Sequence, residues 1–136
     1  MDNIIEHIYN ALPDGDKAFV FGSEHVPLDD LDNNKKYFIF GNGSYSVAML
    51  TKGDKTKDKK TAYWLTIITH PVHRRKKLAT HLLLDEVKPF IEKCNGQLFS
   101  RVMKTNTISQ EFHERHGAVK INEDGTHYVY KFVTIV

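Results

Sequence analysis

The sequence is short of several residue types that would otherwise guide its interpretation. Its one cysteine, Cys94, cannot form an internal disulfide, which fits a reducing, cytoplasmic setting. No apolar run approaches the roughly 20 residues that span a bilayer, and the acidic start Met1-Asp2-Asn3 lacks the basic region of a signal peptide. We therefore expect one domain over residues 1–136, with no membrane partner and a core large enough to fold without disulfides.

Net charge is also small, but it is unevenly distributed. The formal net charge of +2 does not by itself indicate a nucleic-acid partner. However, the segment Lys52–Lys60 carries five lysines against two aspartates, and Arg74-Arg75-Lys76-Lys77 is a run of four cations. The lysine-rich segment has two interpretations, a solvated hairpin tip or a patch for a polyanion or a phosphorylated ligand.

The apolar periodicity predicts an α/β fold, in which helices cover a mixed sheet. The expected helices span residues 3–12, 75–93 and 106–116. The expected strands span residues 17–21, 36–41, 44–51, 61–69, 98–103, 119–121 and 128–135, with a loop over 23–34. Because the strand 61–69 is apolar on both faces, it should be central, and the unit 61–103 should be a parallel crossover.

Three local details are predicted within and beside these helices. Pro89 should kink the helix 75–93, because its ring excludes the carbonyl of Asp85. Thr107 and Gln110 form a capping-box pattern at the start of the helix 106–116. Cys94 is expected to be a buried, small apolar residue.

The junction between the strand 61–69 and the helix 75–93 carries the strongest functional signal. There His70-Pro71-Val72-His73 leads directly into the four cations. A helix N-terminus offers backbone N–H groups and the positive end of the macrodipole, so it favours anions. Four cations at that end oppose the dipole by a few tenths of a kcal/mol or more unless an anion is bound. The junction is therefore predicted to hold phosphates.

Two blocks of the sequence resemble the GCN5-related N-acetyltransferase (GNAT) family. The first block, His70-Pro71-Val72-His73-Arg74-Arg75-Lys76-Lys77-Leu78-Ala79-Thr80-His81-Leu82-Leu83, resembles the acyl-CoA-binding motif Arg/Gln-x-x-Gly-x-Gly/Ala. The second block, residues 106–118, looks like the family's later helix, in which an asparagine begins the helix and an aromatic pair precedes Gly-Phe. The resemblance implies a GNAT-like mixed sheet flanked by helices, with a shortened or rearranged part over residues 1–35.

The resemblance also implies acetyl-CoA as acyl donor and a set of residues that bind it. Backbone N–H groups of Arg75 to Ala79 and the cationic side chains would hold the pyrophosphate. Backbone groups of Ile67–Thr69, in the strand 61–69, would bind the pantetheine arm. This requires the strand 61–69 to separate from the strand 98–103. One departure is Lys77, which stands at the family's first glycine. The implied cofactor residues are Ile67, Ile68, Thr69, Arg74, Arg75, Lys76, Lys77, Leu78, Ala79, Thr80, Asn106 and Ser109.

Two histidines are candidates for proton transfer. The family often uses a glutamate on the central strand as base, but this strand has none, and His70 is the nearest titratable group. A water relay, or a packing role for His70, are the alternatives. His113 aligns with the tyrosine that commonly protonates the thiolate in the family, and a solvent-facing helix histidine is its alternative. Asn106 and Ser109 could bond the coenzyme arm, cap the helix, or both.

Two functions of different classes follow from these observations. The first is an acyl-CoA-dependent N-acyltransferase that transfers an acyl group, expected to be acetyl, directly to a primary amine of an unknown acceptor, without a metal. The alternative is a non-catalytic or degenerate GNAT-fold protein that binds nucleic acid or another polyanion through Lys52–Lys60 and Arg74–Lys77. The chain is expected to be a monomer or a homodimer, and the strand Tyr128–Ile135 would either pair across a dimer or cover the core.

Overall fold

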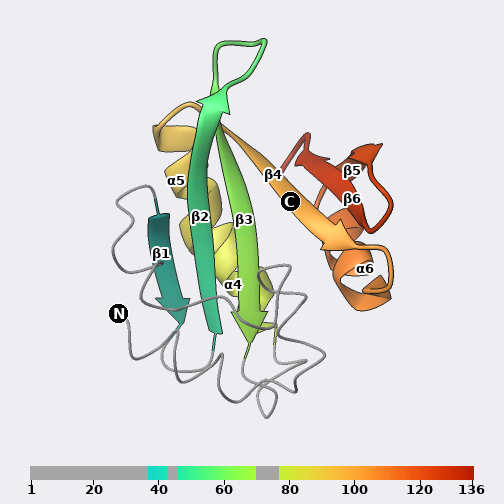
Figure 1. Cartoon of the computed structure of the whole chain (residues 1–136). Helices are drawn as coiled ribbons and strands as arrows, with labels where there is room; N and C mark the ends of the chain where they lie inside the picture. The colour runs from blue at the N-terminus through green and yellow to red at the C-terminus, as the bar shows by residue number, and fades with distance from the viewer. Residues whose placement is uncertain (1–36, 43–45, 70–76) are drawn as a thin grey trace.

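A computed structural model describes residues 37–42, 46–69 and 77–136. Within these ranges, six strands form one sheet in the order β1-β2-β3-β4-β6-β5 (Figure 1). The strands are β1 (Tyr37–Asn42), β2 (Ser46–Lys55), β3 (Thr61–Thr69), β4 (Gly96–Met103), β5 (Ala118–Glu123) and β6 (His127–Phe132). The predictions for the helix 3–12, the strand 17–21, the loop 23–34, His70 and Arg74 to Lys76 lie outside the described residues.

The first half of the sheet is built from two hairpins, as the turn signals indicate. β1 pairs antiparallel with β2 up to Asn42 opposite Ser46, so the predicted pairing of these two strands is confirmed. Gly41 and Asn42, predicted as part of the turn, belong to β1, and residues 43–45 lie outside the described residues. β2 continues to Lys55, further than expected, and a turn leads into β3. β3 has the predicted bounds and lies inside the sheet between β2 and β4, with which it pairs in antiparallel and parallel sense respectively.

The crossover from β3 to β4 is a helix in three parts. It comprises α4 (Leu78–Leu82), the π-helical segment η2 (Leu83–Val87) and α5 (Lys88–Lys93). The predicted start at residue 75 is wrong, because Lys77 has left-handed backbone angles, φ 60° and ψ 21°, and is the N-cap. Pro89 lies in the first turn of α5, just after the π-helical segment. The departure from α-helical geometry therefore precedes the proline by about one turn.

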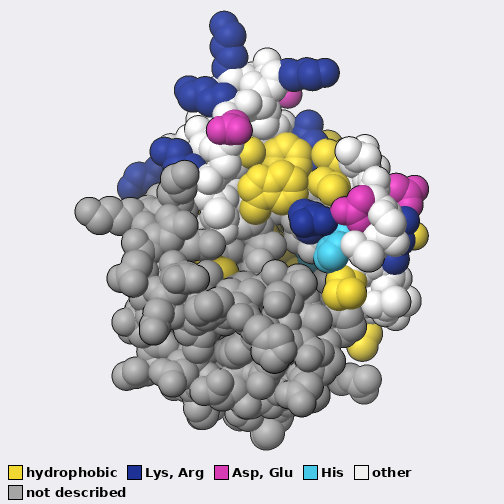
Figure 2. Space-filling view, in the orientation of Figure 1, with side chains coloured by type: hydrophobic (Ala, Val, Ile, Leu, Met, Phe, Trp, Pro, Cys, Tyr) yellow, Lys and Arg dark blue, Asp and Glu magenta, His cyan; other side chains and the backbone are white. Residues whose placement is uncertain are grey.

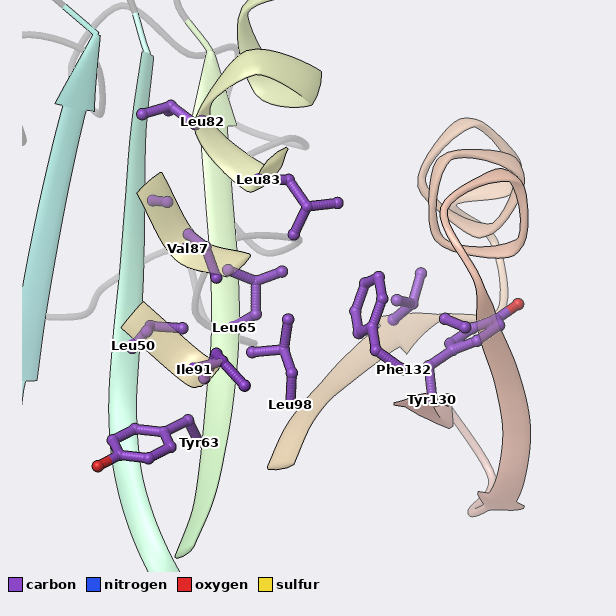
Figure 3. Close-up of a cluster of buried hydrophobic side chains, with 13 residues drawn as sticks. Leu50, Tyr63, Leu65, Leu82, Leu83, Val87, Ile91, Leu98, Tyr130 and Phe132 are labelled. Atoms are coloured by element: carbon purple, nitrogen blue, oxygen red, sulfur yellow. The ribbon is translucent and has the colours of Figure 1, made fainter. Parts of the chain in front are cut away.

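The core lies between this helix and one face of the sheet (Figure 3). Tyr63 and Leu65 of β3 and Leu98 of β4 are buried against the helix, whose buried side chains are Leu82, Leu83, Val87 and Ile91. Full burial of a leucine stabilises a fold by about 1.5–3 kcal/mol. Cys94 is exposed, so the prediction of a buried cysteine is wrong. It follows the last helical residue as the C-cap, where the chain turns towards β4.

The C-terminal part adds α6 (Thr107–Arg115) and the β5–β6 hairpin. β6 lies between β4 and β5, with Tyr130 and Phe132 buried, so the terminal strand covers the core and β5 forms the sheet edge. The capping box is wrong by one residue, because Asn106 is the N-cap and its side chain accepts a hydrogen bond from the N–H of Ser109. None of the helices in the described ranges is long and apolar enough to cross a membrane.

Candidate functional site

β3 and β4 form a fork, as the family resemblance implies. Within the described residues, their parallel ladder joins Thr61–Trp64 to Gly96–Phe99, and both strands continue beyond it and diverge (Figure 1). The carbonyl of Leu65, directly past the last pair, accepts a hydrogen bond from Ser100 Oγ at 3.1 Å, so it faces β4. Backbone groups alternate along a strand, and Ile67 and Thr69 therefore face the fork while Ile68 faces β2.

The first turn of α4 presents backbone N–H groups of three residues, Leu78, Ala79 and Thr80. The sequence predicts that backbone N–H groups from Arg75 to Ala79 bind the pyrophosphate. Among the described residues, only the N–H groups that follow Lys77 belong to the helix start and fit this prediction. A non-glycine residue in the left-handed region costs about 1–2 kcal/mol. Lys77 stands where the family motif has its first glycine, and its backbone has the conformation that favours glycine.

Thr80 connects α4 to α6 and to the end of the chain. His116 donates from Nδ1 to the carbonyl of Val136 at 2.5 Å, since a carbonyl only accepts. Its Nε2 is then the acceptor for the Thr80 hydroxyl, at 3.0 Å. His116 is buried, with the Phe112 ring in edge contact at 4.7 Å between centroids. The first turn of α4 is therefore held by α6 and by the C-terminal segment together.

His113 lies in a buried, largely aromatic environment. The side chain is 6% exposed, and the rings of Phe112, Tyr130 and Phe132 lie within 5.6 Å of it. Burial lowers the pKa of His113 from 6.5 to about 4, against the opposing effect of its hydrogen bond to Ser109. The imidazole is therefore neutral at pH 7.

His113 and Ser100 form a hydrogen-bonded pair at the vertex of the fork. His113 Nδ1 donates to the carbonyl of Ser109 at 2.6 Å, which leaves Nε2 to accept from the Ser100 hydroxyl at 2.9 Å. The Ser100 proton thus has two acceptors within reach, His113 Nε2 and the Leu65 carbonyl. As a neutral acceptor, His113 orients the Ser100 hydroxyl, and its role as proton donor stays a prediction.

Ser100 is a site residue that the sequence reasoning missed. It is 3% exposed and occupies an inward position of β4 between Leu98 and Val102. The sequence does contain a signal for it, since this serine is a single hydroxyl among the inward apolar residues of the strand. A buried polar group needs a hydrogen-bond partner, so such a position indicates a contact with another polar group. Asn106 and Ser109, by contrast, are engaged in the start of α6, and their contact with a coenzyme arm stays a prediction.

The candidate site and the lysine-rich turn lie apart on the molecule. The structure brings together the fork residues of β3, the start of α4, and Ser100 with His113. The lysine-rich turn lies before Thr61, at the other end of β3 from Thr69, so it is not part of this group. The nine residues of β3 are separated by eight steps of about 3.3 Å, so Thr61 and Thr69 lie roughly 26 Å apart.

Comparisons with known proteins agree with this arrangement. The model of the acetyltransferase (GNAT) family matches residues 7–118. No curated protein sequence matches the chain. Among solved structures, the GNAT domain of S. lividans PAT superposes with a TM-score of 0.74 at 12% identity, over 96% of this chain and 84% of that one.

Two further solved structures are similar over almost the whole chain. Ribosomal-protein-alanine N-acetyltransferase from Brucella melitensis has a TM-score of 0.69 at 11% identity, covering 100% of this chain and 96% of its own. The putative acetyltransferase yncA from Salmonella typhimurium, solved with acetyl-CoA, has a TM-score of 0.67 at 15% identity, covering 96% and 86%. The sequence motifs, the fork between β3 and β4 and the family match lead to one conclusion: the chain belongs to the GNAT family of acetyltransferases.

Proposed function

We propose that the protein is an N-acyltransferase that transfers an acetyl group from acetyl-CoA directly to a primary amine. The observation that carries the proposal is the fork between β3 and β4, with the first turn of α4 following it along the chain. Structures of relatives solved with acetyl-CoA, including yncA, support the choice of donor. Bound acetyl-CoA would supply the acyl group as an activated thioester.

The first turn of α4 would hold the diphosphate. The N–H groups of Leu78, Ala79 and Thr80 are the donors, and the partial positive charge of the helix N-terminus adds to them. Arg74 and Arg75 precede this turn in the sequence and would add charge-assisted bonds. Lys77 can serve in place of glycine because its backbone already has left-handed angles.

The fork would position the acyl group. The backbone N–H of Ile67 faces the fork and is the donor that would polarise a thioester carbonyl, because preorganised amides stabilise developing negative charge. Ile67 is partly buried against the core, which limits its movement. Most of the rate enhancement would come from holding donor and amine together.

Ser100 and His113 would assist departure of the sulfur. The neutral His113 positions the Ser100 hydroxyl at the vertex of the fork. The hydroxyl would turn its single proton from His113 Nε2 or the Leu65 carbonyl to the departing sulfur. Over the whole reaction, the proton that the amine nitrogen loses ends on that sulfur. An acceptor that starts as a free ammonium loses a further proton before it attacks; removing that first proton costs roughly 4–5 kcal/mol at pH 7, and His70 or a water chain would accept it.

A direct assay tests the proposal. The protein is mixed with acetyl-CoA and a panel of amines (polyamines, amino sugars, and peptides with free α- or ε-amines), and both the free thiol and the acetylated amine are measured. The proposal expects equal amounts of the two products with at least one amine. Thiol release that never matches an acetylated amine, across the panel, would contradict it.

A further inference from the structure

The turn between β2 and β3 displays five lysines on an ordered support. The N–H of Thr56 donates to the carbonyl of Lys60 at 2.7 Å, and the N–H of Lys59 donates to the carbonyl of Thr56 at 2.9 Å. Lys52, Lys55, Lys57 and Lys59 are exposed. Among the described residues none of the five forms an ion pair, so their charge is not neutralised within the turn except by the nearby Asp54 and Asp58.

An aromatic pair lies at the base of this turn. Trp64 of β3 stacks on Phe99 of β4, with ring centroids 5.3 Å apart and planes at 29°. Both rings are partly exposed and lie on the sheet face opposite the core, because Tyr63, Leu65 and Leu98 point the other way. Gly53 lies against the Trp64 indole, where an added Cβ would be 3.1 Å from Nε1. The segment Lys52–Lys60 thus lies next to Trp64 through Gly53.

This face of the molecule combines positive charge with flat apolar surface. Figure 2 shows apolar side chains gathered below the projecting lysines of the turn. Lys131 of β6 is opposite Phe99 in the register and therefore adds a cation on the same face. We name Lys57, Lys59, Lys60, Trp64, Phe99 and Lys131 the lysine–aromatic surface. Lys52 and Lys55 are opposite Tyr63 and Thr61 in the register, so they lie on the other face of the sheet and are not part of this surface.

We propose that the lysine–aromatic surface binds single-stranded nucleic acid. Lysines that track a phosphate backbone, beside aromatic rings on which bases stack, are the recurring elements of such surfaces. An acidic peptide would be attracted by the lysines, but it has no π face to use Trp64 and Phe99. The stacked pair therefore favours nucleic acid over an acidic protein.

The proposal is independent of acyl transfer. The surface begins at the Thr61 end of β3, whereas the fork opens towards Thr69. Nucleic acid and acetyl-CoA would therefore bind together without competition. Loss of one activity in a variant need not affect the other, so the two proposals fail separately.

Trp64 provides the readout because it is the only tryptophan in the chain. Titration with a single-stranded thymidine oligomer of about 12 nucleotides should quench its fluorescence, since bases stack on aromatic rings. The logarithm of the binding constant should fall with the logarithm of salt concentration at a slope of about −2.8 to −3.5, for about four to five neutralised phosphates. Saturating acetyl-CoA should leave the affinity unchanged.

Charge-matched variants locate the binding. Lys57→Gln with Lys59→Gln should lower the affinity at least fivefold at low salt and make the slope shallower by about 1.4. Lys88→Gln with Lys93→Gln, on α5 behind the sheet, removes the same charge and should change the affinity less than twofold. Equal affinities of the two variants would overturn the proposal. Fluorescence that the oligomer does not change, or that poly-glutamate quenches to the same extent, would also overturn it.

Discussion

Thr80, in the first turn of α4, donates a hydrogen bond to His116, at the end of α6, over 3.0 Å. The other nitrogen of His116 donates to the carbonyl of Val136. One buried imidazole therefore fixes the start of α4 against α6 and the C-terminal segment. In the proposed function, this link holds the backbone N–H groups that bind the diphosphate.

Thr80→Val should weaken acetyl-CoA binding while the fold persists. Valine has nearly the shape of threonine but leaves His116 Nε2 without its donor, and a lost hydrogen bond costs about 1 kcal/mol. We expect the KM for acetyl-CoA to rise about fivefold, with kcat changed less than twofold. Thr107→Val, at an exposed position of α6, is the matched control. A kcat that falls while KM stays constant would contradict a positioning role for Thr80.

Lys77→Gly should stabilise the protein. Glycine removes the strain of φ 60° at this position, although it also gains freedom in the unfolded chain. Relative to Lys77→Ala, which keeps the strain, we expect Lys77→Gly to raise the free energy of unfolding by about 1 kcal/mol in urea titrations. A lower stability for the glycine variant would show that Lys77 does not hold left-handed angles in solution.

His113 should make stability fall in acid. Because burial lowers its folded-state pKa to about 4, below the usual 6.5, the unfolded chain binds this proton more readily. Stability should therefore be complete above pH 6.5 and decline as pH falls towards 4, by roughly 3 kcal/mol from this group. Urea unfolding between pH 8 and 4 measures the decline.

His113→Gln should remove most of this pH dependence, at some cost in stability at pH 7. His81→Gln, at an exposed histidine of α4, serves as the control and should keep the wild-type profile. Identical profiles for wild type and His113→Gln would show that another group causes the acid destabilisation.

Ser100→Ala should lower the rate of acyl transfer more than donor binding. The variant removes the only side-chain hydroxyl that contacts both His113 and the Leu65 carbonyl among the described residues. We expect kcat to fall about 10- to 100-fold, as for loss of a hydrogen bond made in the transition state, with KM for acetyl-CoA within threefold. Ser100→Thr should restore part of the activity. Full activity in Ser100→Ala would remove this residue from the mechanism.

Much of the fold could be predicted because its signals are local. β3 was found with its observed bounds, since its apolar run is continuous and bounded by polar residues. The N-cap of α6 was placed one residue late because Asn106-x-x-Ser109 and Thr107-x-x-Gln110 overlap, and sequence alone does not rank them. The first turn of α4 was placed too early because left-handed angles at a lysine have no sequence signature.

The candidate site was less predictable, since its chemistry depends on packing. His113 was identified from its alignment with a tyrosine, but its burial arises from Tyr130 and Phe132, strand residues distant in the sequence. Ser100 gained its importance only when β4 brought it beside His113. Thr80 was included as part of the motif, and its bond to His116 joins residues 36 positions apart.

Calorimetric titration with acetyl-CoA tests the central claim most directly. Wild type should bind one equivalent with a dissociation constant near the micromolar range typical of enzyme substrates. Arg74→Glu with Arg75→Glu should weaken binding about 30-fold, or ~2 kcal/mol, whereas Lys88→Glu with Lys93→Glu, which carries the same charge change on α5, should stay within twofold. Equal affinities in the two variants, or no heat with wild type at millimolar acetyl-CoA, would contradict the account.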